Sequence, residues 1–188
     1  FEDLDANEIV RKWRRSNPWA GDIWRRYQRA IDTAVRGPGI DIPVGRVTFH
    51  SDGEKFLWCK LPSERFLAYP FPRWEPYFTP WDEERMGATF QMHFKPPAGK
   101  EPLRNHARGA LLFQNTVQAV AADILRDALL EADDAGLAIV GHVHDEIIGQ
   151  GGEEDGKVLD KIMNTLPWWA EGLPISTGGV SLGERYGK

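Results

Sequence analysis

Apolar positions at helical spacing predict two helices near the start of the chain. Residues 5–17 carry a stripe of two aliphatic residues and a tryptophan, and Asp5 followed by Glu8 has the spacing of a helix-start signal. An Asn-Pro pair ends this helix because proline disfavours helical geometry in the residue before it. A second apolar stripe predicts a helix over about residues 20–35, which a Gly-Pro-Gly sequence ends.

The pattern then changes to short alternating runs, which predict strands. Residues 44–49 and 55–60 flank an Asp-Gly pair and form a predicted hairpin. Repeated prolines between residues 70 and 110 argue against long helices or central strands there. Helical spacing returns over about residues 111–132. The apolar face predicted for this helix consists of Val117, Val120, Ala121, Ile124 and Ala128.

Residues 138–148 predict a β-hairpin with an acidic turn. The β-branched residues on both sides favour strands, whereas His144, Asp145 and Glu146 form a compact polar cluster between them. Adjacent carboxylates resist desolvation unless a cation, a basic partner or a proton offsets them. Mg²⁺ often takes one or two carboxylates together with substrate phosphates. A metal-binding turn and an ordinary solvated hairpin tip are both compatible with this pattern.

The end of the chain predicts a helix, a turn and a strand. A helix over residues 153–166 directs Val158, Leu159, Ile162 and Met163 inward. Trp168 and Trp169 follow in a proline-led turn and are expected in the core, and residues 175–182 are a strand candidate. Antiparallel strands mixed with helices predict an α+β fold, in which helices back a sheet that carries the acidic hairpin.

Two amide side chains distinguish the helix over residues 111–132. Asn115 and Gln118 lie three residues apart and therefore project together. Amides donate and accept hydrogen bonds, which suits base edges or sugar atoms in a minor groove. The alternative is a polar edge of the helix without a ligand.

Charge and composition limit the possible classes of protein. The 188 residues carry a net charge of −5, which counts against a nucleic-acid binder, and no apolar run approaches the length of a membrane span. Cys59, the single cysteine, excludes an intrachain disulfide, fits a reducing cytoplasm and is expected to be a buried thiol. Basic side chains nevertheless gather locally, which suits a domain with one DNA-facing side. These clusters contain Arg11, Lys12, Arg14, Arg15, Arg25, Arg26, Arg29, His93, Lys95, Lys100, Arg104, His106 and Arg108.

The order of these motifs resembles a known family. Asn115-Thr-Val-Gln118-Ala, a continuing helix, a break at Gly136 and then Val-His-Asp-Glu resemble the C-terminal palm of family A DNA polymerases. These enzymes are related to bacterial DNA polymerase I, and the chain is most similar to their bacteriophage members. The likeness extends to a Leu-Pro-Ser-x-Arg turn, where Glu64 occupies a position that is commonly glycine, and to Gly109, expected as a hinge into the amide helix.

The resemblance implies a division of the chain and a role for each motif. Residues 1–40 would follow the nucleotide-binding helix of the fingers, and residues 41–188 would form one compact, palm-like unit with antiparallel strands. The implied activity is template-directed transfer of a nucleotide from dNTP to a primer 3′-hydroxyl with Mg²⁺. The implied metal ligands are Asp145 and Glu146, with His144 at the primer end. The implied DNA contacts are Asn115 and Gln118 in the minor groove and Arg108 at a phosphate.

The resemblance also implies missing parts. The second metal-binding aspartate and the triphosphate-binding helix of the family would lie upstream of Phe1, so we expect another polypeptide to carry them and this chain to be inactive alone. A start at Phe is typical of a fragment or processed product, and residues 183–188 resemble a natural end. Two alternatives stay open. One is a noncatalytic DNA-binding or interaction subunit, and the other is a metal hydrolase that uses His142, His144 and Asp145.

Overall fold

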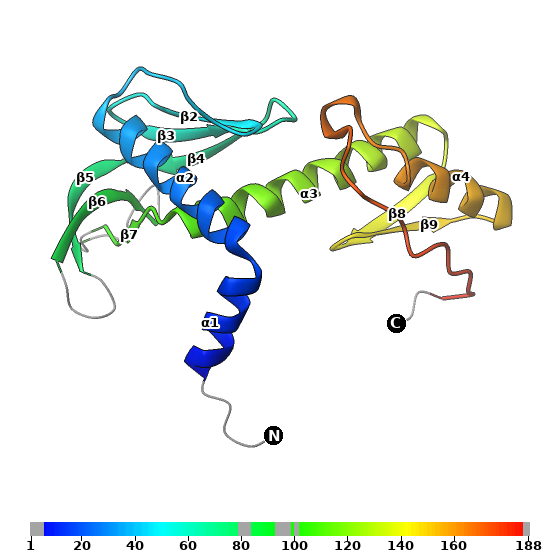
Figure 1. Cartoon of the computed structure of the whole chain (residues 1–188). Helices are drawn as coiled ribbons and strands as arrows, with labels where there is room; N and C mark the ends of the chain where they lie inside the picture. The colour runs from blue at the N-terminus through cyan, green and yellow to red at the C-terminus, as the bar shows by residue number, and fades with distance from the viewer. Residues whose placement is uncertain (1–5, 79–83, 93–98, 100–101, 186–188) are drawn as a thin grey trace. The chain divides into compact units, whose positions relative to one another are not determined.

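A computed structural model describes residues 6–78, 84–92, 99 and 102–185. Helices and antiparallel sheets confirm the α+β class (Figure 1). Contacts group the chain into two units that divide after Val117, which differs from the expected division at residue 40. The difference arises because the second helix packs against strands that follow it. The assignment of segments to fingers and palm stays a prediction.

Both predicted N-terminal helices are confirmed, as α1 (Ala6–Ser16) and α2 (Pro18–Arg36). Proline in the first turn of α2 costs no internal hydrogen bond, because the first N–H groups of a helix have no partner within it. No residue of α1 is buried, and Trp13 stacks on Trp24 with ring centroids 6.1 Å apart. The expected helix-start residue Asp5 lies outside the described residues.

In the described part of the chain, four strands form an antiparallel sheet in the order β1-β2-β3-β4. Their bounds are β1 (Ile42–Val44), β2 (Val47–Ser51), β3 (Phe56–Lys60) and β4 (Phe66–Pro70). The predicted Asp-Gly hairpin is confirmed between β2 and β3. Asp52 closes its turn, because one carboxylate oxygen accepts the backbone N–H groups of Glu54, Lys55 and Phe56 at 2.8–2.9 Å.

The described residues form a second antiparallel sheet from β5 (Arg73–Phe78), β6 (Glu84–Gln91) and β7 (Arg104–His106). The expectation that residues 70–110 hold no central strand is wrong, because β6 lies between β5 and β7. The proline count misled because the prolines fall outside β6. Pro76 lies in β5, where an edge position tolerates the missing N–H.

Alternation along β2 and β3 directs one set of side chains against α2. Phe49, Leu57 and Cys59 are fully buried, and the Tyr27 ring of α2 meets Phe49 edge-on with centroids 5.4 Å apart. Burial raises the pKa of the Cys59 thiol to about 11, although Thr116 offers a hydrogen bond that opposes the rise. The prediction of a buried structural thiol is therefore confirmed.

The long helix α3 (Gly109–Asp134) confirms the predicted amide helix and part of its predicted apolar face, since Ala128 is buried. Val117 is 50% exposed and Ala121 is also exposed, whereas the polar residues Thr116 and Asp123 are buried. The hydrophobic pattern misplaced the first half of this face because polar residues occupy two of the packed positions. No helix in the described ranges is long and apolar enough to span a membrane.

The second unit packs two strands and a helix against the end of α3. β8 (Ala138–Val143) and β9 (Glu146–Gln150) form an antiparallel pair, followed by α4 (Glu153–Met163) and a short 3-10 helix η1 (Trp168–Ala170). Its buried core consists of Ala128, Ala132 and Ile162, with Leu137, Ile139, Ile147, Leu159 and Met163 packed around them.

Three expectations for the C-terminal segment are wrong. Val158 is 43% exposed rather than inward, and Trp168 is 77% exposed, although Trp169 is buried as predicted. Residues 175–182, all of them described, form no strand. Instead, Thr177 is fixed to the end of α4 by hydrogen bonds with Asn164 and Asp160. These side-chain contacts take the place of strand pairing.

Candidate functional site

The acidic hairpin is confirmed, with a shorter loop than the sequence predicts. Val143 pairs directly with Glu146, so His144 and Asp145 alone form the loop and Glu146 begins β9. His144 has a φ of 55°, and a positive φ is what the tight two-residue hairpin loops require at their first position. Histidine adopts this conformation more readily than most residues with a Cβ atom. The loop therefore fixes the backbone of the two residues.

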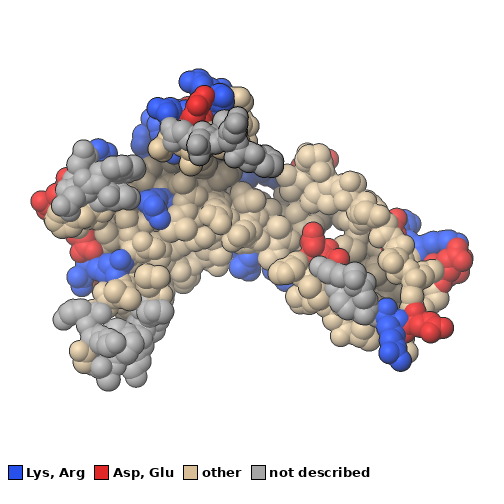
Figure 2. Space-filling model, turned by 90° about the horizontal axis from the view of Figure 1, so that it is seen from below, with Lys and Arg blue, Asp and Glu red and all other residues tan. Residues whose placement is uncertain are grey.

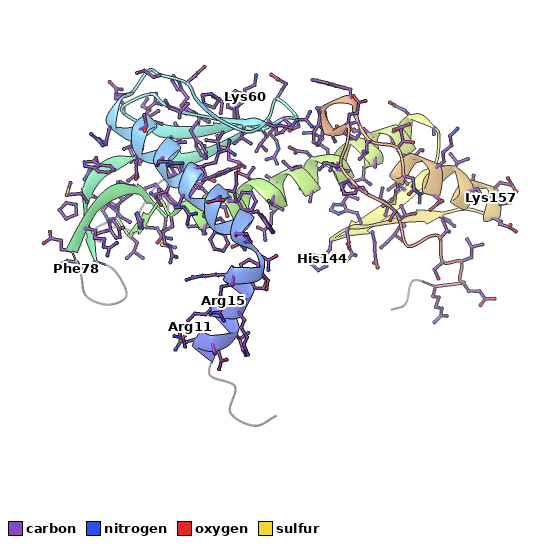
Figure 3. The ribbon with its side chains drawn as sticks, in the orientation of Figure 1. Arg11, Arg15, Lys60, Phe78, His144 and Lys157 are labelled. Carbon is purple, nitrogen blue, oxygen red and sulfur yellow. The ribbon has the colours of Figure 1, made fainter. Side chains whose placement is uncertain are left out.

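The base of the hairpin is anchored and its tip is exposed. Ile139 and Ile147 pack against the core of the second unit, whereas His144, Asp145 and Glu146 are all exposed. Figure 3 labels His144 at the tip of the hairpin. Successive strand residues face opposite sides, so Glu146 faces away from the side on which Ile147 packs. The two carboxylates thus belong to one hairpin, with Asp145 in the loop and Glu146 at the start of β9.

The hairpin offers part of a metal site. Carboxylate oxygens are the ligands that Mg²⁺ prefers, and Asp145 and Glu146 supply two carboxylates without needing to unfold the strand pair. Within the described residues, no three His, Cys, Asp or Glu side chains gather as a ligand set. The residues present therefore fit a metal that further ligands complete, and they do not by themselves enclose one.

The geometry removes the basis for the zinc alternative. That idea required His142 and His144 to alternate along one strand and so to face the same side. His144 lies in the loop, however, and β8 is irregular between Ile139 and Gly141. His142 is paired with Ile147 on β9. The two histidines are therefore not consecutive residues of one strand face.

Arg108 lies at the entry to α3, where the backbone is packed closely. The neighbouring residues Ala107 and Gly109 are buried, whereas Arg108 is exposed. A Cβ atom on Gly109 would lie 2.2 Å from the backbone oxygen of Trp24. The expectation that Gly109 is a hinge is therefore wrong, because the glycine permits α3 to begin against the backbone of α2.

Gln28 of α2 fixes the same entry, a contact that the sequence does not reveal. Its side-chain oxygen accepts the backbone N–H of Gly109 at 2.9 Å, which satisfies one of the first N–H groups of α3. Its amide nitrogen donates to Asp32 at 3.0 Å and to the carbonyl of Ala107 at 3.3 Å. The backbone around Arg108 is thus held from both sides, which directs its side chain outward.

The amide residues occupy different surroundings on α3. The amide of Asn115 donates to the hydroxyl of Tyr69 at 3.4 Å, whereas Gln118 is exposed. Tyr69 is only 6% exposed, and burial raises the pKa of its hydroxyl, which stays a neutral hydrogen-bonding group. Asn115 belongs to the first unit, and Gln118 and the hairpin belong to the second. The alternation of residues along β4 did not predict that Tyr69 would be the hydrogen-bond partner of Asn115.

Two basic residues near Arg108 have structural contacts. Arg104 is 18% exposed at its side chain and pairs with Glu75 at 2.5 Å, so it braces the second sheet. His106 stacks on Tyr77 with ring centroids 3.6 Å apart, and burial, aided by the positive charge of Arg108, lowers its pKa to about 4. Both residues therefore contribute less to a DNA-facing surface than the sequence suggests.

The remaining basic residues do not form a continuous stripe on the face shown in Figure 2. Lys and Arg side chains there occur as separate groups among uncharged and acidic ones. The basic residues of α1, which include Arg11, Lys12, Arg14 and Arg15, are exposed. His93, Lys95 and Lys100 lie outside the described residues.

Comparison with known proteins relates the sequence of this chain to a phage protein. No protein-family model matches the chain, and no solved structure matches it significantly. Over 178 residues the chain is 34% identical to a protein named DNA polymerase from Bacillus phage SP02. The alignment covers 92% of this chain and 26% of that protein, so the chain spans about a quarter of the length of the relative. The similarity supports a relationship to a phage DNA polymerase.

Proposed function

We propose that this chain is the C-terminal part of a template-directed DNA polymerase of the family A type. The reaction joins a primer 3′-hydroxyl to the α-phosphate of an incoming dNTP and releases pyrophosphate. The observation that carries the proposal is an exposed Asp145-Glu146 pair at the tip of a paired hairpin, in a chain that is 34% identical over 92% of its length to a phage DNA polymerase.

The proposal gives the hairpin the role of a half-site for Mg²⁺. Asp145 is the metal ligand, Glu146 is an accessory carboxylate near the metal or the primer end, and His144 positions that end. These residues would hold Mg²⁺, which would supply charge stabilisation to the oxygens of an in-line displacement. The two-residue loop and the first residue of β9 place the three side chains at the tip of one strand pair, where a substrate can approach because the tip is exposed.

The proposal gives the first turns of α3 the role of a DNA contact. Asn115 and Gln118 would meet the minor groove of the nascent pair, where acceptor positions are similar for each correct pair. Such contacts check geometry without sequence preference. Arg108, held outward at the entry to the helix, would contact a phosphate. Tyr69 supports this role because it buries a hydroxyl beside Asn115 and so limits the rotamers of the amide.

Further carboxylates must complete the site. The described residues gather no three metal-ligating side chains, and the chain spans about a quarter of the related polymerase. We therefore propose that another polypeptide segment supplies the second aspartate and the dNTP-binding helix. Primer extension by the 188-residue chain alone would contradict this requirement.

The test combines metal binding with activity. Mn²⁺, added as a probe to the 188-residue chain, is expected to broaden amide NMR signals around residues 143–147, and Asp145→Asn is expected to abolish that broadening. In the native assembly that contains the chain, the same substitution is expected to slow primer extension by about 10²-fold or more, because a metal supplies several kcal/mol of charge stabilisation.

Asp134→Asn is the matched control, since this carboxylate is also exposed and lies in the second unit outside the hairpin. This variant is expected to leave both the Mn²⁺-dependent NMR broadening and the rate of primer extension unchanged. If Asp145→Asn leaves synthesis at the wild-type rate, the chain is instead a noncatalytic DNA-binding or interaction subunit.

A further inference from the structure

The four-stranded sheet has an outer face that α2 does not cover. In β3, Leu57 and Cys59 are buried on the side of α2. Because side chains alternate along a strand, the other residues of β3 point away from α2. Figure 3 shows Lys60 on this side. The outer face carries Phe56, Trp58 and Phe66, which we name the aromatic platform.

The three rings of the aromatic platform lie in contact. Phe56 and Trp58 have ring centroids 4.7 Å apart with the planes tilted by 44°, and Trp58 meets Phe66 edge-on at 6.1 Å. Phe66 is 51% exposed although it lies in a paired strand, whereas Phe56 and Trp58 are half-buried. A contiguous apolar patch that reaches the surface can mark an interaction site. Such rings also lose little conformational entropy on binding, because they have few rotatable bonds.

Charged and polar side chains are interleaved with the rings. Lys60 lies directly across from Phe66, and its side chain is 40% exposed. His50 lies directly across from Trp58, and its ring nitrogen lies 2.8 Å from a carboxylate oxygen of Asp41. Lys60 pairs with Glu64 at 2.5 Å, an exposed ion pair that a phosphate group can replace at little cost.

We propose that the aromatic platform binds single-stranded DNA by stacking of its bases, with Lys60 at a phosphate. Every base presents a π-face, so aromatic rings on a sheet bind single strands without sequence preference. A duplex hides those faces, so the platform discriminates against it. This surface lies wholly in the first unit and needs neither the acidic hairpin nor a metal. The proposal therefore goes beyond the proposed polymerase chemistry.

The charges around the aromatic platform indicate which interaction would supply most of the affinity. Lys60 contributes one positive charge, and the acidic residues Asp41 and Glu64 lie against His50 and Lys60. Stacking is then the main source of affinity. Each phosphate contact to a single strand contributes about −0.7 to the slope of log K against log salt. With Lys60 as the one phosphate contact, the expected slope is therefore shallow, about −0.7, unlike that of a basic groove.

The test measures the affinity of the 188-residue chain for fluorescein-labelled oligo(dT) of fifteen nucleotides by fluorescence anisotropy. Phe66→Ala is expected to weaken binding about 5- to 100-fold, the range for loss of one base–aromatic stack. Phe66→Trp is expected to retain binding. Phe66→Leu, which keeps apolar volume but removes the ring, is expected to lose it as alanine does.

Matched controls lie elsewhere on the surface. Phe78→Ala removes an aromatic ring that is 68% exposed on the second sheet, and Lys157→Ala removes a lysine that, like Lys60, pairs with nearby glutamates on its own segment (Figure 3). Both are expected to bind as wild type, whereas Lys60→Ala is expected to bind severalfold more weakly. Circular dichroism of each variant establishes that it is folded.

Three results would overturn the proposal. They are equal losses for Phe66→Ala and Phe78→Ala, equal affinity for a duplex of the same length, and wild-type DNA affinity in Phe66→Ala combined with loss of self-association in sedimentation. The last result would make the platform a protein interface. Because the assay contains neither primer nor dNTP, its outcome does not depend on whether the polymerase proposal holds.

Discussion

Gly109→Ala tests how closely α3 approaches α2, because two physical effects predict opposite signs. Alanine is the better helix former by up to about 1 kcal/mol, so helix propensity alone predicts a more stable protein. The structure predicts the reverse. The added Cβ atom would lie 2.2 Å from the backbone oxygen of Trp24 and 2.7 Å from the backbone nitrogen of Gln28. Neither atom belongs to a flexible side chain that can rotate away.

The magnitude follows from what must move. Ordinary contact begins at 3.4 Å, so α2 and the start of α3 must separate by about 1 Å. Overpacking of this kind costs about 1–3 kcal/mol. The separation also stretches the bond from the Gly109 N–H to Gln28, at a cost of about 0.5–1.5 kcal/mol. After the propensity gain of about 1 kcal/mol is subtracted, we expect a net loss of about 0.5–3.5 kcal/mol, against the ~5–15 kcal/mol of a typical domain.

Urea unfolding followed by circular dichroism measures this loss as a lower midpoint. Gly21→Ala is the matched control because Gly21 lies within α2, and its Cβ atom would meet only the mobile end of Arg25 at 3.3 Å. That variant is expected to gain about 0.5–1 kcal/mol. A Gly109→Ala protein as stable as wild type would refute the close approach of the two helices, and with it the argument that Arg108 is held outward.

Two further predictions concern a turn and a histidine. Glu64 has a φ of 66°, so Glu64→Gly is expected to stabilise the chain by about 0.5 kcal/mol, because relief of the left-handed strain exceeds the added entropy of glycine. Urea midpoints measure the gain, and an equal gain from Glu54→Gly, which has no such φ, would contradict the reason. The pKa of His106 is lowered to about 4 in the folded chain, so the unfolded chain takes up this proton first. Stability is therefore expected to fall as pH decreases from about 6.5 towards 4. His106→Phe, which keeps the stacking on Tyr77, should flatten that part of the profile. Parallel profiles of stability against pH for the wild type and His106→Phe would contradict the assignment of this loss of stability to His106.

The elements were predictable because their signals are local. Helical spacing and proline or glycine stops locate α1, α2 and α3 to within a few residues, and strand alternation around an Asp-Gly pair locates β2 and β3. The acidic hairpin was predictable from a local pattern of the same kind, because β-branched runs on both sides of a polar cluster indicate two strands and the loop between them. His144, Asp145 and Glu146 could therefore be placed at a hairpin tip before any contact was known.

The buried face of α3 was only partly predictable, because it depends on partners distant in the sequence; Ala128 is buried as predicted. Val117 and Ala121 satisfy the hydrophobic pattern yet are exposed, whereas Thr116 is buried. Thr116 tolerates burial because its hydroxyl donates to the carbonyl of Leu112 at 2.9 Å. A periodic pattern records side-chain polarity and does not record whether a polar group finds a partner.

By itself, then, the sequence determined where the chain turns, which segments are helices and strands, and that two carboxylates stand at a hairpin tip. Each of these follows from backbone preferences that act over a few residues. Only the tertiary structure decided that Gly109 is a contact between backbones, that Tyr69 lies beside Asn115, and that the rings of Phe56, Trp58 and Phe66 lie in contact on one face of the sheet. Those facts depend on strand register and helix packing, which bring together residues that no local pattern connects.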